Sequence, residues 1–295
     1  MRNAFIEELV TLATENDRIA LIVGDLGYSV VEPFAEKFPE RFINAGVAEQ
    51  NMMGLAAGMA SEGYQVFVYS IANFPTFRCA EQIRNDVDYH KLPVTIVSVG
   101  GGLAYGNLGY SHHAVQDYGL MRLMPNILIA APGDPMEVRA CMRYLISHPQ
   151  PSYLRLGKAG EPCFHREVPD VKPGQWLSVD KGDDGATKTF LTTGAPLAEA
   201  HKWRSSGAFA GYAVHSMPLW SMAVKNLQAD HVASWESIIT VEDHLADCGF
   251  GSWLRESLEC APHLMPRVSV RALNSRICGM VAKQSVLNEA GDLTA

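Results

Sequence analysis

The stretch INAGVAEQNMMGLAAGMASEGYQVFVYS, residues 43–70, decides the fold because it joins a helix signal to a buried-strand signal. Residues 50–62 are small and apolar enough to predict a helix, and YQVFVYS predicts a strand that is apolar on both faces. Strands of this kind, separated by helices, indicate a largely parallel sheet that is covered on two sides.

The same alternation runs outward from this stretch. Apolar strands and helical segments alternate as far as Gly157, and a second alternation, with a helix expected near 219–228, begins at residue 188. The segment between these two regions is rich in Pro, Gly and charge. We therefore predict an α/β protein that has a mostly parallel sheet in residues 1–160, a linker in 161–187 and a smaller α/β domain in 188–295.

The composition is typical of a soluble globular enzyme, with 47% hydrophobic and 19% charged residues among 295. A formal net charge of −8 argues against a basic surface for nucleic acid. The chain shows neither a secretory signal nor an apolar run of about 18 residues, so we expect it to be cytoplasmic. Its six cysteines lack CxxC spacing, which argues against a zinc site and a disulfide framework.

Glu49 is the only residue with a formal charge between Arg41 and Glu62, and small and apolar residues surround it. One interpretation is a helix start, because an acid in the first turn is favoured by roughly 0.3–1 kcal/mol. The other is a catalytic acid in a dry pocket, where burial would raise the proton affinity of a carboxyl group. The residues alone leave both interpretations open.

Two glycine-rich segments follow predicted strands. GDLG at 24–27 lacks the spacing of a phosphate loop and also lacks the second Gly of a GDG motif, so a strand-end turn is the simpler interpretation. VGGGLAYGNLGYSHH at 99–113 ends in His112 and His113. Ligands bind at the carboxyl ends of strands in open α/β sheets, so this segment predicts a site.

Ile71, Phe74 and Phe77 are spaced three apart. In a helix they would form one stripe, which indicates either core packing or a surface for a flat heterocycle.

Four segments together resemble the pyrimidine-binding and C-terminal domains of transketolase, in order and over nearly the whole chain. They are VAEQNMMGLAAGMASEG, YSIANFPTFRCAEQIRN, GYSHHAVQD with MRLMPNILIAAPGDPMEV, and TVEDHLADCGFGSWLRE. The diphosphate- and magnesium-binding domain, with its GDG motif, is missing. The chain is therefore similar to the second subunit of a split transketolase, and the expected fold is the thiamine diphosphate-binding pyrimidine-domain fold.

This resemblance implies thiamine diphosphate as cofactor and an N-terminal partner subunit that holds the diphosphate and most of the Mg²⁺ coordination, with no metal on this chain. An α2β2 assembly is expected. Glu49 would hydrogen-bond the N1′ nitrogen of the aminopyrimidine and Phe74 would stack on that ring. Ile71 and Phe77 would flank the ring, and Asp25 would lie near the thiazolium.

The resemblance also implies a substrate site. His112 matches a substrate-facing histidine able to shuttle protons, and the positions that bind the sugar phosphate are Arg2, Ser29 and Lys158. Two family groups that read donor hydroxyls are absent, because Gly100 replaces a His and Leu108 replaces an Asp. Both absences suggest an altered donor, less hydroxylated or a 2-oxoacid.

We therefore expect a transferase subunit that moves a two-carbon ketol or acyl unit to an aldehyde, which could be a sugar phosphate. The alternatives are a beta subunit of a 2-oxoacid dehydrogenase-type enzyme, a 1-deoxyxylulose-5-phosphate synthase-like enzyme and a non-catalytic partner subunit.

Overall fold

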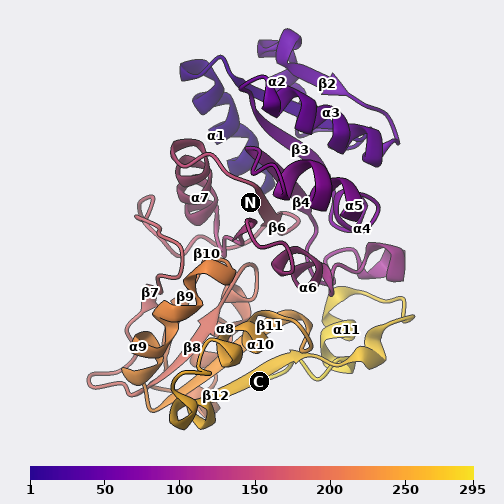
Figure 1. Cartoon of the computed structure of the whole chain (residues 1–295). Helices are drawn as coiled ribbons and strands as arrows, with labels where there is room; N and C mark the ends of the chain where they lie inside the picture. Colours follow the sequence, from indigo (N-terminus) through magenta and orange to yellow (C-terminus); the bar gives the residue numbers. More distant parts are fainter.

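The computed structural model describes residues 1–295, apart from the side chain of Ala208, and contains two sheets (Figure 1). The first sheet has seven strands in the order β10-β5-β6-β4-β3-β1-β2, and all its pairs are parallel except β10 with β5. Its strands are β1 (Ile19–Val23), β2 (Phe42–Asn44), β3 (Gln65–Ile71), β4 (Val94–Val99), β5 (Leu128–Ala130), β6 (Ser152–Leu156) and β10 (Leu219–Trp220).

Both faces of this sheet are buried. Ile22 and Val68 pack with Met52 into one hydrophobic cluster, whereas their strand neighbours Leu21 and Phe67 belong to another. This alternation explains why the strands read as continuous apolar runs. The cluster of Leu21 and Phe67 includes residues of α1 (Arg2–Glu15), α2 (Glu32–Lys37) and α7 (Pro135–Ser147). The cluster of Ile22 and Val68 includes residues of α3 (Glu49–Ser61) and α6 (Asp117–Arg122). The short helices α4 (Phe74–Phe77) and α5 (Ala80–Gln82) follow β3.

The second sheet has five strands in the order β12-β11-β8-β9-β7, and only the β7–β9 pair is antiparallel. The elements are β7 (Leu177–Asp180), β8 (Lys188–Thr192), β9 (Ala213–Ser216), β11 (Ser237–Leu245), β12 (Val268–Leu273), α8 (Leu197–Ser205), α9 (Gln228–Ala233), α10 (Phe250–Glu256) and α11 (Gln284–Ala290). A third cluster, with Phe190, Trp203 and Val241, packs α8 and α11 against this sheet, while α9 and α10 pack against it through the cluster of Ile22 and Val68.

The two sheets are joined through buried Arg155 on β6. It donates hydrogen bonds to Asp117 at 2.7 Å and to Asp243 of β11 at 2.8 Å. A second link is the strand β10, which follows β9 in the chain but pairs with β5 of the first sheet. The predicted helix at 219–228 is therefore wrong at its start, because fully buried Leu219 and Trp220 pair with Ala130 and Ile129.

The predicted α/β class with mostly parallel sheets is confirmed. The division at residues 160 and 187 stays a prediction. Strand β7 lies inside the segment that was expected to be a linker and pairs with β9. None of the described helices is long and apolar enough to cross a membrane.

Candidate functional site

The site lies at the carboxyl ends of β1, β3 and β4, where the chain leaves the first sheet. Glu49 is the first residue of α3 and is only 5% exposed. Its Oε1 accepts a hydrogen bond from Nη1 of Arg78 at 2.7 Å. Glu49 is thus a buried acid with a cationic partner: it begins a helix, as one interpretation expects, and it also lines a cavity, while its catalytic role stays a prediction.

Phe74 begins the short helix α4 directly after β3. The hydroxyl of Thr76 is buried and donates to the carbonyl of Ala72 at 2.9 Å, which holds the turn between β3 and α4. The guanidinium carbon of Arg78 lies 4.0 Å from the centre of the Phe74 ring. Arg78 therefore contacts both the acid and the aromatic ring that the sequence predicts to bind the pyrimidine.

Two cavities meet at Arg78. One, of about 580 Å³, is lined by the residues Asn73, Phe74, Phe77, Arg78, Tyr110, Ser111, Gln116 and Leu120. The other, of about 490 Å³, is lined by the residues Val47, Ala48, Glu49, Gln50, Asn51 and Arg78. Arg78 is the residue that they share, so Phe74 and Glu49 face different cavities on the two sides of one side chain.

His112 packs its ring against Phe74, with ring centres 5.3 Å apart and an interplanar angle of 70°. Partial burial, together with the nearby His113 and the positive charge of Arg78, lowers the pKa of His112. The imidazole is consequently neutral at pH 7 and can both accept and donate a hydrogen bond. His113 is buried beneath it, and Asn73 donates to the His113 carbonyl at 2.9 Å, which fixes this loop.

Gly100 follows β4 with φ +82°, and a Cβ added there would overlap the ring of Tyr105. The Tyr105 ring lies between His112, at 6.4 Å between ring centres, and Lys158, whose Nζ is 5.2 Å from the ring centre. The rings of Phe74, His112 and Tyr105 thus contact one another in succession, and the Tyr105 ring also contacts Lys158.

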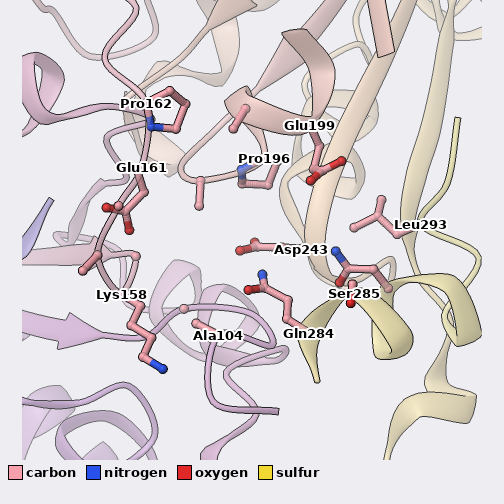
Figure 2. A pocket seen from close by; sticks show the side chains of 17 residues that line it. Ala104, Lys158, Glu161, Pro162, Pro196, Glu199, Asp243, Gln284, Ser285 and Leu293 are labelled. Carbon is pink, nitrogen blue, oxygen red and sulfur yellow. The ribbon is translucent and has the colours of Figure 1, made fainter. Parts of the chain in front are cut away.

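Lys158 also lines a third cavity, of about 360 Å³, which Figure 2 shows from close by. Asp243 and Gln284, from the C-terminal region, face this cavity from the other side, and the amino group of Lys158 points away from Asp243 (Figure 2).

Asp25 and Ser29 lie on the loop after β1. Asp25 exchanges two hydrogen bonds with the Asn44 side chain, at 3.0 and 3.1 Å, and lines a separate cavity with Tyr28 and Glu32. The backbone N–H of Ser29 donates to Glu32 at 2.7 Å. The hydrogen bonds of these two predicted residues therefore join them to Asn44 and Glu32, and not to Phe74 or His112.

Arg2 is the first residue of α1 and lies beside Tyr69, where its positive charge opposes the effect of burial, which raises the Tyr69 pKa to about 12. The Nε of Arg2 is buried and has no hydrogen-bond partner among the described residues. Ile71 is the last residue of β3, so the expected single helical stripe does not form: only Phe74 and Phe77 share a helix.

The residues present fit an aminopyrimidine ring. Such a ring needs a carboxyl partner for one ring nitrogen and an aromatic face to stack on, and the planar guanidinium of Arg78 already makes both kinds of contact with Glu49 and Phe74. No group of three or more His, Cys, Asp or Glu side chains suited to a metal ion occurs within the described part of the chain.

The sequence interpretation missed Arg78, Tyr105 and Asn44. A charge within the aromatic stretch FPTFRC is a signal for Arg78, because a guanidinium next to aromatic rings can lie over their faces. Asn44 and Tyr105 carry no such signal, since only the fold brings them to Asp25 and Gly100.

Comparison with known proteins decides the family. Residues 1–160 match the family model described as transketolase, pyrimidine binding domain. The chain belongs to the transketolase family. Among its relatives, one of the subunits of the apulose-4-phosphate transketolase of Phocaeicola vulgatus is 31% identical, over 88% of this chain and 84% of that protein. A putative transketolase C-terminal section of Methanocaldococcus jannaschii is 32% identical, over 87% of this chain and 81% of that protein.

A solved structure, a split gene transketolase described as an inactive beta4 tetramer, has a TM-score of 0.82 and 31% identity. The match covers 99% of this chain and 93% of that one. The family and fold expected from the sequence are therefore confirmed, and the transketolase relatives of similar length are separate subunits or sections.

Proposed function

We propose that this chain is the C-terminal subunit of a split, thiamine diphosphate-dependent transketolase that transfers a two-carbon unit to an aldehyde acceptor. The observation that carries the proposal is the pairing of buried Glu49 and the face of Phe74 around one planar group. When bound, the cofactor supplies the carrier for the two-carbon unit; the protein supplies placement and proton transfer.

Each predicted residue has a task that its surroundings allow. Glu49 would hold a proton at the pyrimidine N1′, and Phe74 and Phe77 would orient that ring from one side. His112, neutral at pH 7, would accept or donate a proton at the substrate oxygen. The cations Arg2 and Lys158 would bind a phosphate together with Ser29 of the loop after β1, Ile71 at the end of β3 would flank the ring, and Asp25 would lie near the thiazolium.

A partner subunit would complete the site. Val47, Phe77 and Tyr110 line the two cavities that meet at Arg78, and they are 74%, 46% and 47% exposed. Apolar groups gathered at a cleft indicate an interface. We propose that an N-terminal subunit covers them, that it holds the diphosphate and Mg²⁺, and that two copies of each chain form an α2β2 assembly. A cytoplasmic location stays a prediction.

The donor is proposed to differ from a ketose phosphate. Gly100 offers no side chain, and Leu108 is an exposed apolar residue, so neither can hydrogen-bond a donor hydroxyl. A site without such partners gains nothing from extra hydroxyls. This observation favours a less hydroxylated donor or a 2-oxoacid, and activity with hydroxypyruvate, pyruvate and ketose phosphates in the reconstituted pair would separate these classes.

The test of the proposed function is Glu49→Gln in the reconstituted pair. Gln keeps the shape but cannot hold the N1′ proton in the same way, so turnover should fall by about 10²-fold or more. The matched control is Glu62→Gln at the other end of α3, where the side chain is exposed. Urea unfolding of both variants checks folding, and unchanged turnover in a well-folded Glu49→Gln pair would defeat the proposal.

A further inference from the structure

We propose that Arg78 occupies the pyrimidine site while the cofactor is absent, in this chain alone and in the pair with its partner, and must withdraw before the cofactor binds, an inference that rests on the proposed function. The guanidinium uses the two contacts that the aminopyrimidine would need. Its Nη1 donates to Glu49 Oε1 at 2.7 Å, and its carbon lies 4.0 Å from the centre of the Phe74 ring. The Arg78 guanidinium and the aminopyrimidine cannot both contact the Glu49 carboxylate oxygen and the Phe74 ring face at the same time.

The shape of the site supports the same conclusion. Glu49 and Phe74 line different cavities, and the Arg78 side chain separates the two. A ring that stacks on Phe74 while bonded to Glu49 must lie across this boundary. Withdrawal of Arg78 would join the two spaces into one cleft, whereas no movement of the sheet is required.

Arg78 is built to leave. Its side chain is 47% exposed, and its hydrogen bond to Glu49 is the one it donates within the described structure. Glu49, by contrast, is fixed at the start of α3 and is 5% exposed. Loss of this contact leaves the carboxylate without its cation, at a modest cost because Glu49 lines a cavity that water can enter. Arg78 therefore stabilises the site while it is empty, and the same contact competes with the cofactor.

The experiment measures thiamine diphosphate binding to the reconstituted pair by calorimetry and stopped-flow fluorescence. Arg78→Ala removes the competitor, so the Kd should fall about threefold to thirtyfold. In the wild type, the observed binding rate should level off at high cofactor concentration because the withdrawal of Arg78 becomes limiting. In Arg78→Ala the rate should rise linearly. Arg78→Lys keeps the charge but not the planar guanidinium, so its Kd should lie between those of the wild type and Arg78→Ala.

Arg84→Ala is the matched control, because Arg84 donates only to Asn85 at the surface. Its Kd should equal that of the wild type. Weaker or unchanged cofactor binding in both Arg78→Ala and Arg78→Lys would overturn the inference. Loss of turnover in Glu49→Gln with no gain in cofactor affinity in Arg78→Ala would refute only the inference, whereas unchanged turnover in Glu49→Gln would refute the proposed function itself.

A separate observation concerns Tyr105, and we infer that this residue selects the donor. Its ring fills the space into which a side chain at Gly100 would point, and the positive φ of Gly100 further excludes a side chain there. The ring stands between His112 and Lys158, so a substrate that reaches from the imidazole toward the lysine passes an aromatic face. This face suits a short, less hydroxylated donor and restricts a longer ketose chain.

Tyr105→Leu in the reconstituted pair should raise the ratio of kcat/KM for fructose 6-phosphate to that for hydroxypyruvate by about tenfold. Tyr105→Phe, which keeps the ring and removes the hydroxyl, should leave the ratio near that of the wild type. The control is Tyr89→Leu at an exposed position, which should change neither value. A ratio unchanged in Tyr105→Leu would overturn the inference, and a wild-type pair that turns over neither of these donors nor pyruvate would overturn the proposed function with it.

Discussion

Among the arginines that pair with buried carboxylates in this molecule, Arg155 and Arg78 are held in different ways. Arg155 is 3% exposed and donates from all three nitrogens, to Asp117, Asp243 and the Ala114 carbonyl. Arg78 is 47% exposed and donates to Glu49 alone among the described residues. Every nitrogen of the Arg155 guanidinium donates a hydrogen bond, and this arginine joins two sheets, whereas Arg78 donates to one oxygen of an acid at the rim of a cleft.

The difference teaches where this fold can change. A buried charge that is hydrogen-bonded on all sides strongly resists removal, because each partner would be left uncompensated. A half-exposed arginine can exchange its contact for water at little cost. The interior pair therefore fixes the architecture, and the rim pair leaves the site adaptable.

The largest effect is expected at the interior pair. Arg155→Met leaves both Asp117 and Asp243 buried without their cation, so the free energy of unfolding should fall by about 3–5 kcal/mol. Urea unfolding of the chain measures it. Arg276→Met is the control, because Arg276 and Asp292 are both more than 60% exposed, and it should change stability by less than about 0.5 kcal/mol. Equal losses in the two variants would break the comparison.

Another buried acid, Glu137, sharpens the comparison because it has no arginine partner among the ion pairs of the described residues. Glu137 on α7 accepts from the Gly133 N–H at 2.7 Å and from the Ser216 hydroxyl at 2.9 Å. Burial raises its pKa from 4.5 to about 7. Between pH 4.5 and about 7, Glu137 therefore keeps its proton in the folded chain but loses it in the unfolded chain. The free energy of unfolding should consequently fall as the pH rises through this range.

Glu137→Gln removes this titration. Its stability should depend less on pH across that window, by about 1–3 kcal/mol relative to the wild type, measured by urea unfolding at several pH values. Nδ1 of His165 lies 3.9 Å from Oε1 of Glu137, and the hydrogen bond to Asp134 raises the pKa of His165. The titration of His165 therefore also makes the free energy of unfolding fall as the pH rises. His165→Asn separates the two contributions. A Glu137→Gln profile parallel to that of the wild type would contradict the prediction.

The smallest effect is expected at the rim. Arg78→Ala in the cofactor-free chain should lower the free energy of unfolding by about 1 kcal/mol, because Glu49 loses its donor but the exposed guanidinium loses little. The measurement is again urea unfolding, with Arg84→Ala as the surface control. A loss as large as that of Arg155→Met would show that the rim pair is structural and not adaptable.

Much of this architecture follows from local pattern. The strands around Ile22 and Phe67 are apolar on both faces because helices cover both, and this made the α/β class predictable. Strand β10 was missed because two residues carry no period, and its pairing with β5 depends on a partner about 90 positions away.

The site was predictable only where one residue type stood out from its neighbours. Glu49 was flagged by its isolated charge, whereas its partner Arg78 lies 29 positions along the chain and is brought near by α4. The sequence shows that residue 100 has no side chain, but it does not show that the ring of Tyr105 fills the space beside it. That contact depends on the path of the turn between the two residues, which only the folded structure gives.

Strand β10 has a consequence for synthesis on the ribosome. Until Leu219 and Trp220 emerge, β5 is an open edge with unpaired backbone groups, which other nascent chains can extend. A fragment that ends before residue 219 would keep this edge permanently and should aggregate, even though it carries the other six strands of the first sheet.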